Sequence, residues 1–337
     1  MAIALLAGNT RIAILPIDTG WWVVHTFFVI SGFMMINSCE KHKEEQSSDI
    51  PKSALDFVLN KAKGMACVYT VSCVLYYLIF AIVRLSAGEE IYIFRFITEL
   101  LGLESAFDRG YMFNGPVWYI SAMLVAMLPL AAILKKNRSL YIYVFAPLLA
   151  LLLHGYMSIT RGSGTTVSRF SIYFIFTGAL ILALCGLCFG AISWIVYERL
   201  SKIDTKGICV AMTIAEAALY VVFAACFFNP NGTVRDAYSV MLLIPLWLAI
   251  VFSKKSYISK LFKFKFMKCF GGLSLYIYLN HWVAVYIVQM LLPDRSYKLS
   301  LMVMFALTAA SCVVCYLVVK ACKKLWNSVL REKILGT

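Results

Sequence analysis

Hydrophobic residues in this chain form long blocks rather than the narrow stripes of a soluble amphipathic helix. A helix that crosses the hydrocarbon core of a bilayer needs about 20 predominantly apolar residues. Nine blocks approach this length, the first and the seventh being short, and they cover residues 21–38, 65–84, 117–134, 140–157, 171–191, 208–228, 237–253, 273–292 and 299–319. The pattern therefore predicts an all-α fold, a polytopic integral membrane bundle of about nine transmembrane helices.

The connections between the blocks are too short for a separate soluble domain. The longest are 39–64 and 85–116, and no internal repeat is visible. We therefore predict one transmembrane domain over residues 21–320, preceded by an N-terminal segment at 1–20 and followed by a basic tail at 321–337.

Composition narrows the class of protein further. Of the 337 residues, 62% are hydrophobic and only 14% are charged, whereas an average soluble domain is about 25% charged. These proportions exclude a disordered chain and a disulfide-stapled secreted domain. The net charge of +14 would also fit a nucleic-acid-binding protein, so the placement of the basic residues has to decide between the two interpretations.

Lysine and arginine are unevenly divided between the two sides of the predicted bundle. The opposite side holds 9 of the 31 basic residues, and the other 22 lie in segments 39–64, 135–139, 192–207, 254–272 and 320–337. Short loops rich in Lys and Arg face the cytoplasm. We therefore expect a multi-pass protein of the cell membrane with its C-terminus in the cytoplasm, residues 1–20 outside and no nucleic-acid partner.

The two sides also differ in the type of basic residue. The outer side has eight Arg and one Lys, whereas the inner side has 19 Lys and three Arg. A guanidinium group binds carboxylate or phosphate in a bidentate manner, while lysine acts as a point charge. The outer arginines therefore fit two roles: pairing with nearby acids at the membrane interface, or recognition of an anionic or sugar-bearing acceptor from outside.

Polar side chains inside predicted spans are informative because their burial is expensive, and three are considered first. Asn280 and His281 are in the eighth block, and Glu216 is in the middle of the sixth. A buried imidazole serves either as a proton carrier near neutral pH or as a hydrogen-bonding link between helices. For Glu216 we favour a structural hydrogen bond to a neighbouring helix.

Small residues inside the blocks fit packing roles. Most of the eleven cysteines are embedded in apolar sequence, and the Cys-x-x-Cys pairs at 185/188 and 312/315 have no His or Asp companions nearby. We therefore predict small apolar filler there rather than a metal site. Gly186 and Gly190 form a small-xxx-small pair, which favours close helix packing.

The first block contains the most specific motif of the chain. Phe27-Phe28-Val29-Ile30-Ser31-Gly32-Phe33, preceded by Gly20 and Val24, resembles the FFxxSGF signature of membrane acyltransferase family 3. Three further motifs follow in the family's order: N-x-x-x-W, an R…F…G helix and a late S-x-x-x-Y-x-x-H stretch. Their residues here are Asn114 and Trp118; Arg169, Phe174 and Gly178; and Ser274, Tyr278 and His281. The resemblance covers nearly the whole predicted transmembrane domain.

The resemblance implies an enzyme, an acyltransferase for groups other than aminoacyl groups. Proteins of this family move an acyl group, commonly acetyl, from cytoplasmic acyl-CoA to a hydroxyl of a cell-surface polysaccharide or related acceptor. It therefore implies acetyl-CoA or another acyl-CoA as donor substrate, no metal, and the lipid bilayer and a glycan or other hydroxyl acceptor as partners. Such proteins act in O-acetylation at the cell envelope.

The resemblance also implies candidate site residues. Acyl transfer needs a base for the acceptor proton, and His281 is the first candidate, with His25 the second. We expect the acyl-CoA pocket to be lined by Phe27, Phe28, Ser31, Gly32, Lys61, Lys63 and Trp118. Arg169 is expected on the acceptor side.

The chain departs from the family's pattern at two places. The family normally begins with a helix that carries an Arg and then a His, the usual catalytic base, and this sequence starts after such a helix. The odd helix count with an exterior N-terminus agrees, so we expect the first helix to be missing and consider His25 as a substitute base. At the second place Lys61 and Gly64 stand where the family often has two arginines, which leaves Lys61 and Lys63 to meet the phosphates of CoA.

Two other classes of function stay open at this stage. A glycan or small-molecule exporter would move the acceptor without modifying it, and it is expected to have internal repeats or paired half-helices, neither of which is visible. A catalytically inactive membrane scaffold is compatible with a missing first helix.

Overall fold

The computed structural model is almost entirely helical in the residues it describes. These are residues 20–41, 49–86, 90–91, 93–102, 114–162, 172–173, 176–228, 234–262, 264–291 and 297–335. Eight helices within these ranges are long and apolar enough to cross a membrane. The prediction of a multi-pass helical membrane protein is therefore confirmed.

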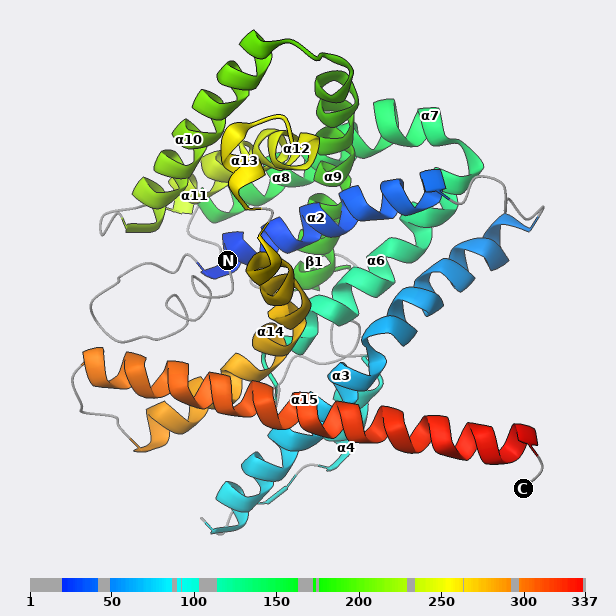
Figure 1. Ribbon diagram of the computed structural model, residues 1–337, viewed down its shortest axis with the longest axis vertical. Coiled ribbons are helices and arrows are strands. Elements are labelled where there is room, and N and C mark those ends of the chain that lie inside the picture. The colour runs from blue at the N-terminus through cyan, green and yellow to red at the C-terminus, as the bar shows by residue number, and fades with distance from the viewer. Residues whose placement is uncertain are drawn as a thin grey trace. The chain divides into compact units, whose positions relative to one another are not determined.

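Figure 1 shows the elements in chain order. They are α2 (Gly20–Lys41), α3 (Ile50–Ser86), α4 (Ile93–Leu100), α6 (Val117–Lys136), α7 (Arg138–Leu140), the π-helical turn η2 (Tyr141–Phe145), α8 (Ala146–Gly162), β1 (Ile172–Tyr173), β2 (Phe176–Thr177), α9 (Gly178–Lys202), α10 (Lys206–Phe228), α11 (Val234–Met241), α12 (Ile244–Ser253), α13 (Tyr257–Leu261), α14 (Lys265–Leu291) and α15 (Tyr297–Leu335).

The chain divides into two compact units. Apart from the first two residues, the first unit comprises Ile3–Asn60 and Tyr119–Cys269, and the second comprises Lys61–Trp118 and Phe270–Thr337. Helices α3, α6 and α14 each contribute residues to both units. In the first unit α9 packs against α2, α8 and α12, and α10 packs against α11, α12 and α13.

The centre of the first unit is a direct backbone contact between α2 and α9. A Cβ atom added to Gly32 of α2 would lie only 2.0 Å from the carbonyl oxygen of Leu187 in α9. In the other direction, a Cβ on Gly190 would lie 2.4 Å from the backbone nitrogen of Phe33, and one on Gly186 would lie 2.4 Å from the Cβ of Phe28. The predicted close packing at Gly186 and Gly190 is therefore confirmed, and its partner is the FFxxSGF helix.

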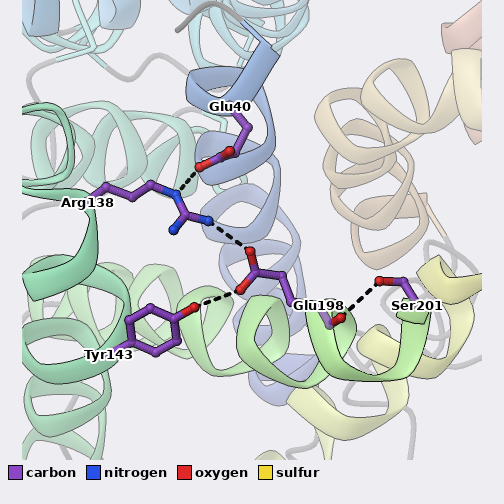
Figure 2. A network of polar contacts seen from close by, with 5 residues as sticks. All are labelled: Glu40, Arg138, Tyr143, Glu198 and Ser201. Atoms are coloured by element: carbon purple, nitrogen blue, oxygen red, sulfur yellow. Dashed lines mark hydrogen bonds and ion pairs between the residues drawn. The ribbon is translucent and has the colours of Figure 1, made fainter. Parts of the chain in front are cut away.

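A polar cluster joins the far end of α2 to the same neighbour (Figure 2). The Arg138 guanidinium donates to the carboxylate of Glu40 in α2 and, at 2.9 Å, to that of Glu198 in α9. The hydroxyl of Tyr143 donates to the other carboxylate oxygen of Glu198 at 2.9 Å. Ser201 donates to the backbone carbonyl of Glu198 at 3.1 Å. One guanidinium thus links the ends of two helices that also touch at their centres.

Glu216 has the structural role that its place in the sequence suggests. Its side chain is fully buried, and one carboxylate oxygen accepts from Ser259 in α13 at 2.9 Å. The other accepts from Tyr220, one turn further along α10, at 3.2 Å. The predicted hydrogen bond to a neighbouring helix is therefore confirmed.

Two predicted blocks differ from single helices. The seventh, 237–253, is divided between α11 and α12, because the helix restarts at Ile244 with Pro245 in its first turn, where a missing N–H does no harm. The fifth, 171–191, begins with the antiparallel pair β1 and β2, and its helix starts only at Gly178, where the Thr177 side chain accepts from the Leu180 N–H.

Helices α3 and α15 extend furthest beyond their predicted blocks. Helix α3 starts at Ile50, well inside the predicted connection 39–64, and α15 continues through the described part of the predicted basic tail to Leu335. At 1.5 Å per residue, the 39 residues of α15 extend about 58 Å, nearly twice the thickness of a hydrocarbon core. The segments at 50–64 and 321–335 are therefore helical extensions rather than loops.

Candidate functional site

Two of the family-like motifs meet within the second unit. The Asn114 side chain donates from Nδ2 to the carbonyl oxygen of Leu279 in α14 at 3.1 Å. The Tyr278 hydroxyl donates to the carbonyl oxygen of Pro116 at 2.9 Å. Both bonds are buried and join residues more than 160 positions apart. The N-x-x-x-W turn is therefore fixed to the S-x-x-x-Y-x-x-H helix.

The turn before α6 is also shaped to receive an aromatic ring from α14. A Cβ atom on Gly115 would lie 3.0 Å from the indole of Trp282, which is closer than ordinary contact. Trp118, at the second position of α6, is 7% exposed. Trp118 is thus a buried residue that follows this turn directly in the sequence.

A second set of hydrogen bonds joins α14 to α3 and α15. The Asn280 side chain donates to the Ser72 hydroxyl at 3.1 Å and to the carbonyl of Tyr276 at 2.9 Å. The Ser72 hydroxyl lies 3.4 Å from the sulfur of Cys315. All four groups lie in membrane-spanning helices, so Asn280 links helices in the way that buried amides commonly do in membrane proteins.

His281 is buried and its ring is oriented by its own helix. The side chain is 1% exposed, and Nδ1 lies 2.6 Å from the carbonyl oxygen of Tyr278 and 3.3 Å from that of Ile277. A carbonyl only accepts hydrogen bonds, so Nδ1 must carry the hydrogen. The neutral ring then has its lone pair on Nε2. This tautomer is the one in which Nε2 can accept a proton.

Glu99 is a buried carboxylate that the sequence interpretation missed. It is 1% exposed, its Oε1 accepts from the backbone N–H of Asn114 at 3.0 Å, and its backbone carbonyl accepts from the Tyr69 hydroxyl. The sequence suggested an exterior loop at 85–116, whereas residues 93–100 form α4. The available signal was the clustering of apolar residues on one face of Ile93-Phe94-Arg95-Phe96-Ile97, a pattern of an amphipathic helix.

In the first unit the FFxxSGF motif surrounds one tyrosine. The hydroxyls of Ser31 and Tyr119 lie 2.9 Å apart, and the Tyr119 hydroxyl is also 3.2 Å from the carbonyl oxygen of Phe27. The Phe28 ring lies 4.5 Å from the Tyr119 ring, centroid to centroid. Sequence reasoning selected Trp118 and passed over its neighbour Tyr119. Gly32 faces the α9 backbone instead of this tyrosine.

The remaining predicted site residues are dispersed. Lys61 is half-buried and Lys63 is exposed. Residues two positions apart in an α-helix point about 200° away from each other around the helix axis, so the two lysines lie on different faces of α3. His25 is 1% exposed and contacts Phe189 edge to face in the first unit. Arg169 and Phe174 lie outside the described residues, and so does the predicted segment at 1–19.

Metal ligands do not gather in the part of the chain that the structure describes. Within those residues no group of three or more His, Cys, Asp or Glu side chains is placed to hold a metal ion. Ten described cysteines are free thiols, and the Cys185 thiol donates to the carbonyl of Ala150 at 3.6 Å.

Comparison with known proteins gives one finding on identity. The acyltransferase domain family, membrane acyltransferase family 3, matches residues 9–320. Searches of curated proteins and of solved structures give no match. The matched region spans most of the chain and includes the FFxxSGF helix, the Asn114 turn and the His281 helix. The chain therefore belongs to the membrane acyltransferase family 3 and is an acyltransferase.

Proposed function

We propose that this protein is a membrane O-acyltransferase that moves an acyl group, most simply acetyl, from cytoplasmic acyl-CoA to a hydroxyl of a cell-surface glycan or related acceptor. Family membership supports acyl transfer in general. The orientation of His281 is the observation that carries the proposal, because donation from Nδ1 to the Tyr278 carbonyl leaves the lone pair on Nε2. A base of this kind is what a hydroxyl acceptor requires.

In the proposed reaction, Nε2 of His281 takes the proton of the acceptor hydroxyl as its oxygen bonds to the thioester carbonyl carbon. The carbon–sulfur bond then breaks, and the proton passes from the imidazolium to the departing CoA thiolate. The products are an O-acyl ester and CoA thiol, and the imidazole is restored. The hydrogen bonds of Asn114 and Tyr278 support this step by holding the surrounding turn and helix together.

The donor is proposed to approach from the cytoplasm. By the positive-inside rule, the lysine-rich segments support a cytoplasmic location for that side of the bundle and for the C-terminus. We assign a CoA phosphate to Lys61, while Lys63, on another face of α3, contributes attraction at longer range. We retain Phe27, Phe28 and Ser31 as proposed pocket-wall residues, Trp118 for the site lining and Arg169 for the acceptor side. Gly32 was expected in the pocket wall too, but it lies against the backbone of α9 and is not retained there.

The proposal is tested with membranes that contain the full-length protein. Membranes are given radiolabelled acetyl-CoA and cell-envelope polysaccharide from the expressing strain, and both thiol release and alkali-labile label on the polysaccharide are measured. We expect both signals with the unaltered protein and a loss of at least about 100-fold with His281→Ala, in the range of a general base. Tyr316→Phe, at an exposed position on α15, is the matched control and is expected to retain full activity.

Two outcomes contradict the proposal. If His281→Ala transfers label as fast as Tyr316→Phe, the imidazole is not the base. If unaltered membranes release no thiol beyond the background of membranes without the protein, enzymatic O-acylation of this polysaccharide is refuted. In that second case the exporter is tested by the amount of polysaccharide at the cell surface, and the inactive scaffold is favoured if this amount is also unchanged.

A further inference from the structure

A pair of histidines lies inside the first unit, apart from the His281 helix. His25 of α2 is 1% exposed and His154 of α8 is 8% exposed. Each ring contacts Phe189 of α9 edge to face, with ring centroids 5.7 Å apart in both cases. His154 also contacts the ring of Tyr238 in α11 at 5.6 Å. Four helices therefore enclose two imidazoles that share one phenylalanine.

The imidazole nitrogens are the unusual feature of this cluster. Neither Nδ1 nor Nε2 of His25 has a hydrogen-bond partner among the described residues, and the same holds for Nδ1 of His154. All three atoms are buried. Buried polar atoms are nearly always paired, because an unpaired one loses its bonds to water without compensation. Two such side chains that contact the same ring point to a ligand that bonds to both.

The surroundings limit what that ligand can be. Phe189 and Tyr238 are buried, and a Cβ atom on Gly186 would come within 3.3 Å of His25 Cε1, so α9 packs closely against the His25 ring and a large group is disfavoured there. The aromatic side chains that contact the two imidazoles, Phe189 and Tyr238, carry no charge, which favours a neutral ligand. A hydroxyl group both donates and accepts, and it can therefore bond to one ring as donor and to the other as acceptor.

We propose that His25 and His154 form a buried binding site for a single hydroxyl group, either an internal water or a hydroxyl of the acceptor. On the predicted topology α2 begins and α8 ends at the exterior, and each histidine lies in the exterior half of its helix. The site is thus on the side where an acceptor arrives. The acceptor alternative rests on the proposed function, whereas the water alternative does not.

The first experiment is a comparison of thermal unfolding in detergent. Apolar variants His25→Leu and His154→Leu remove the hydrogen-bonding atoms, while His25→Asn keeps a polar atom near Nδ1. If a hydroxyl is bound, both leucine variants unfold at a lower temperature and His25→Asn recovers part of the loss. Phe189→Leu is the matched control, since it changes packing in the same cluster without removing a polar atom.

The second experiment uses the unaltered protein, so it does not depend on the variants folding. Histidine is labelled with ¹⁵N, and solid-state NMR in lipid bilayers measures whether the two imidazoles are hydrogen-bonded and whether water transfers magnetisation to them. Transfer from water identifies an internal water. Methyl α-glucoside is then added as a hydroxyl probe, and a rise in unfolding temperature that is absent in His25→Leu and His154→Leu identifies the acceptor source.

The inference is overturned if both leucine variants unfold at or above the temperature of the unaltered protein and the ¹⁵N signals show rings without hydrogen bonds. In that event the nitrogens are simply unpaired. Neither unfolding temperature nor NMR signal depends on acyl transfer, so this failure is distinct from inactivity of the His281 variant in the transfer assay.

Discussion

The contact between α2 and α9 gives the sharpest prediction for the fold, and Gly32→Ala tests it. The added Cβ would lie 2.0 Å from the Leu187 carbonyl oxygen and within 2.8 Å of the Leu187 carbonyl carbon and Cα. Ordinary contact begins near 3.4 Å, so the two backbones would have to separate by about 1.4 Å at this point. The obstructing atoms are backbone, which cannot rotate aside as the end of a side chain does.

The energetic cost follows from that separation. Overpacking in a well-packed core costs about 1–3 kcal/mol, and a gap of 0.5–1 Å already removes roughly a quarter to a half of each dispersion contact along an interface. Because the backbones would have to shift by more than 1 Å, we expect Gly32→Ala to lower the free energy of unfolding by about 3 kcal/mol or more. In a bilayer this loss of packing acts directly on stability, because helix association there depends on packing rather than on a hydrophobic driving force.

The assay is unfolding of the purified protein by increasing mole fractions of SDS, followed by helical circular dichroism. Gly155→Ala is the matched control: it lies in α8 of the same unit, and nothing is within 4 Å of its added Cβ. We expect Gly155→Ala to be neutral or stabilising by about 0.4–1 kcal/mol, as for glycine replacement in an unobstructed helix. Equal stability of the two variants would refute the backbone contact.

Three further changes test the polar contacts. Arg138→Met should lower the free energy of unfolding by about 1 kcal/mol, since the pairs with Glu40 and Glu198 are only partly buried. The stability of Arg138→Lys should lie between that of Arg138→Met and that of the unaltered protein, and SDS unfolding measures both variants. Glu99→Leu should destabilise by about 1–3 kcal/mol by leaving the Asn114 N–H without its acceptor, whereas Glu99→Gln, which keeps an oxygen there, should cost less in the same assay. Tyr119→Phe should cost about 1 kcal/mol in thermal unfolding, and no change would mean that its bond to Ser31 is not formed.

The sequence was most informative where hydropathy alone decides the structure. Long apolar blocks predict helices of membrane-spanning length, and eight such helices are found in the described residues. The block at 237–253 is apolar throughout, yet it is divided, because backbone hydrogen bonding around Pro245 outweighs composition there. Hydropathy also gives no information about the capping of α9 by Thr177, which sets the start of that helix at Gly178 instead of residue 171.

The candidate site was harder to predict, because its contacts join distant parts of the chain. Family-like motifs identified His281 and Asn114, but only the fold reveals that Asn114 bonds to Leu279. Burial of Glu99 was not predicted, because acidic residues in a connection between helices are normally solvated. The role of Tyr119 was not predicted, because its hydrogen-bond partners lie some 90 residues away in α2. Gly32 was expected to line a pocket, and its contact with a backbone was not readable from a one-dimensional motif.

The direct contact of α2 with α9 also constrains how the enzyme can move during turnover. Side chains between helices act as a compliant layer that lets one helix slide over another, and no such layer is present where Gly32 meets Leu187. Because Arg138 also links the ends of α2 and α9, the two helices are expected to move together as one rigid body. Any gating motion within this unit must then occur at helix interfaces that are formed by side chains. One such interface is that between α2 and α12, where Phe33 stacks on Phe252 with ring centroids 4.6 Å apart.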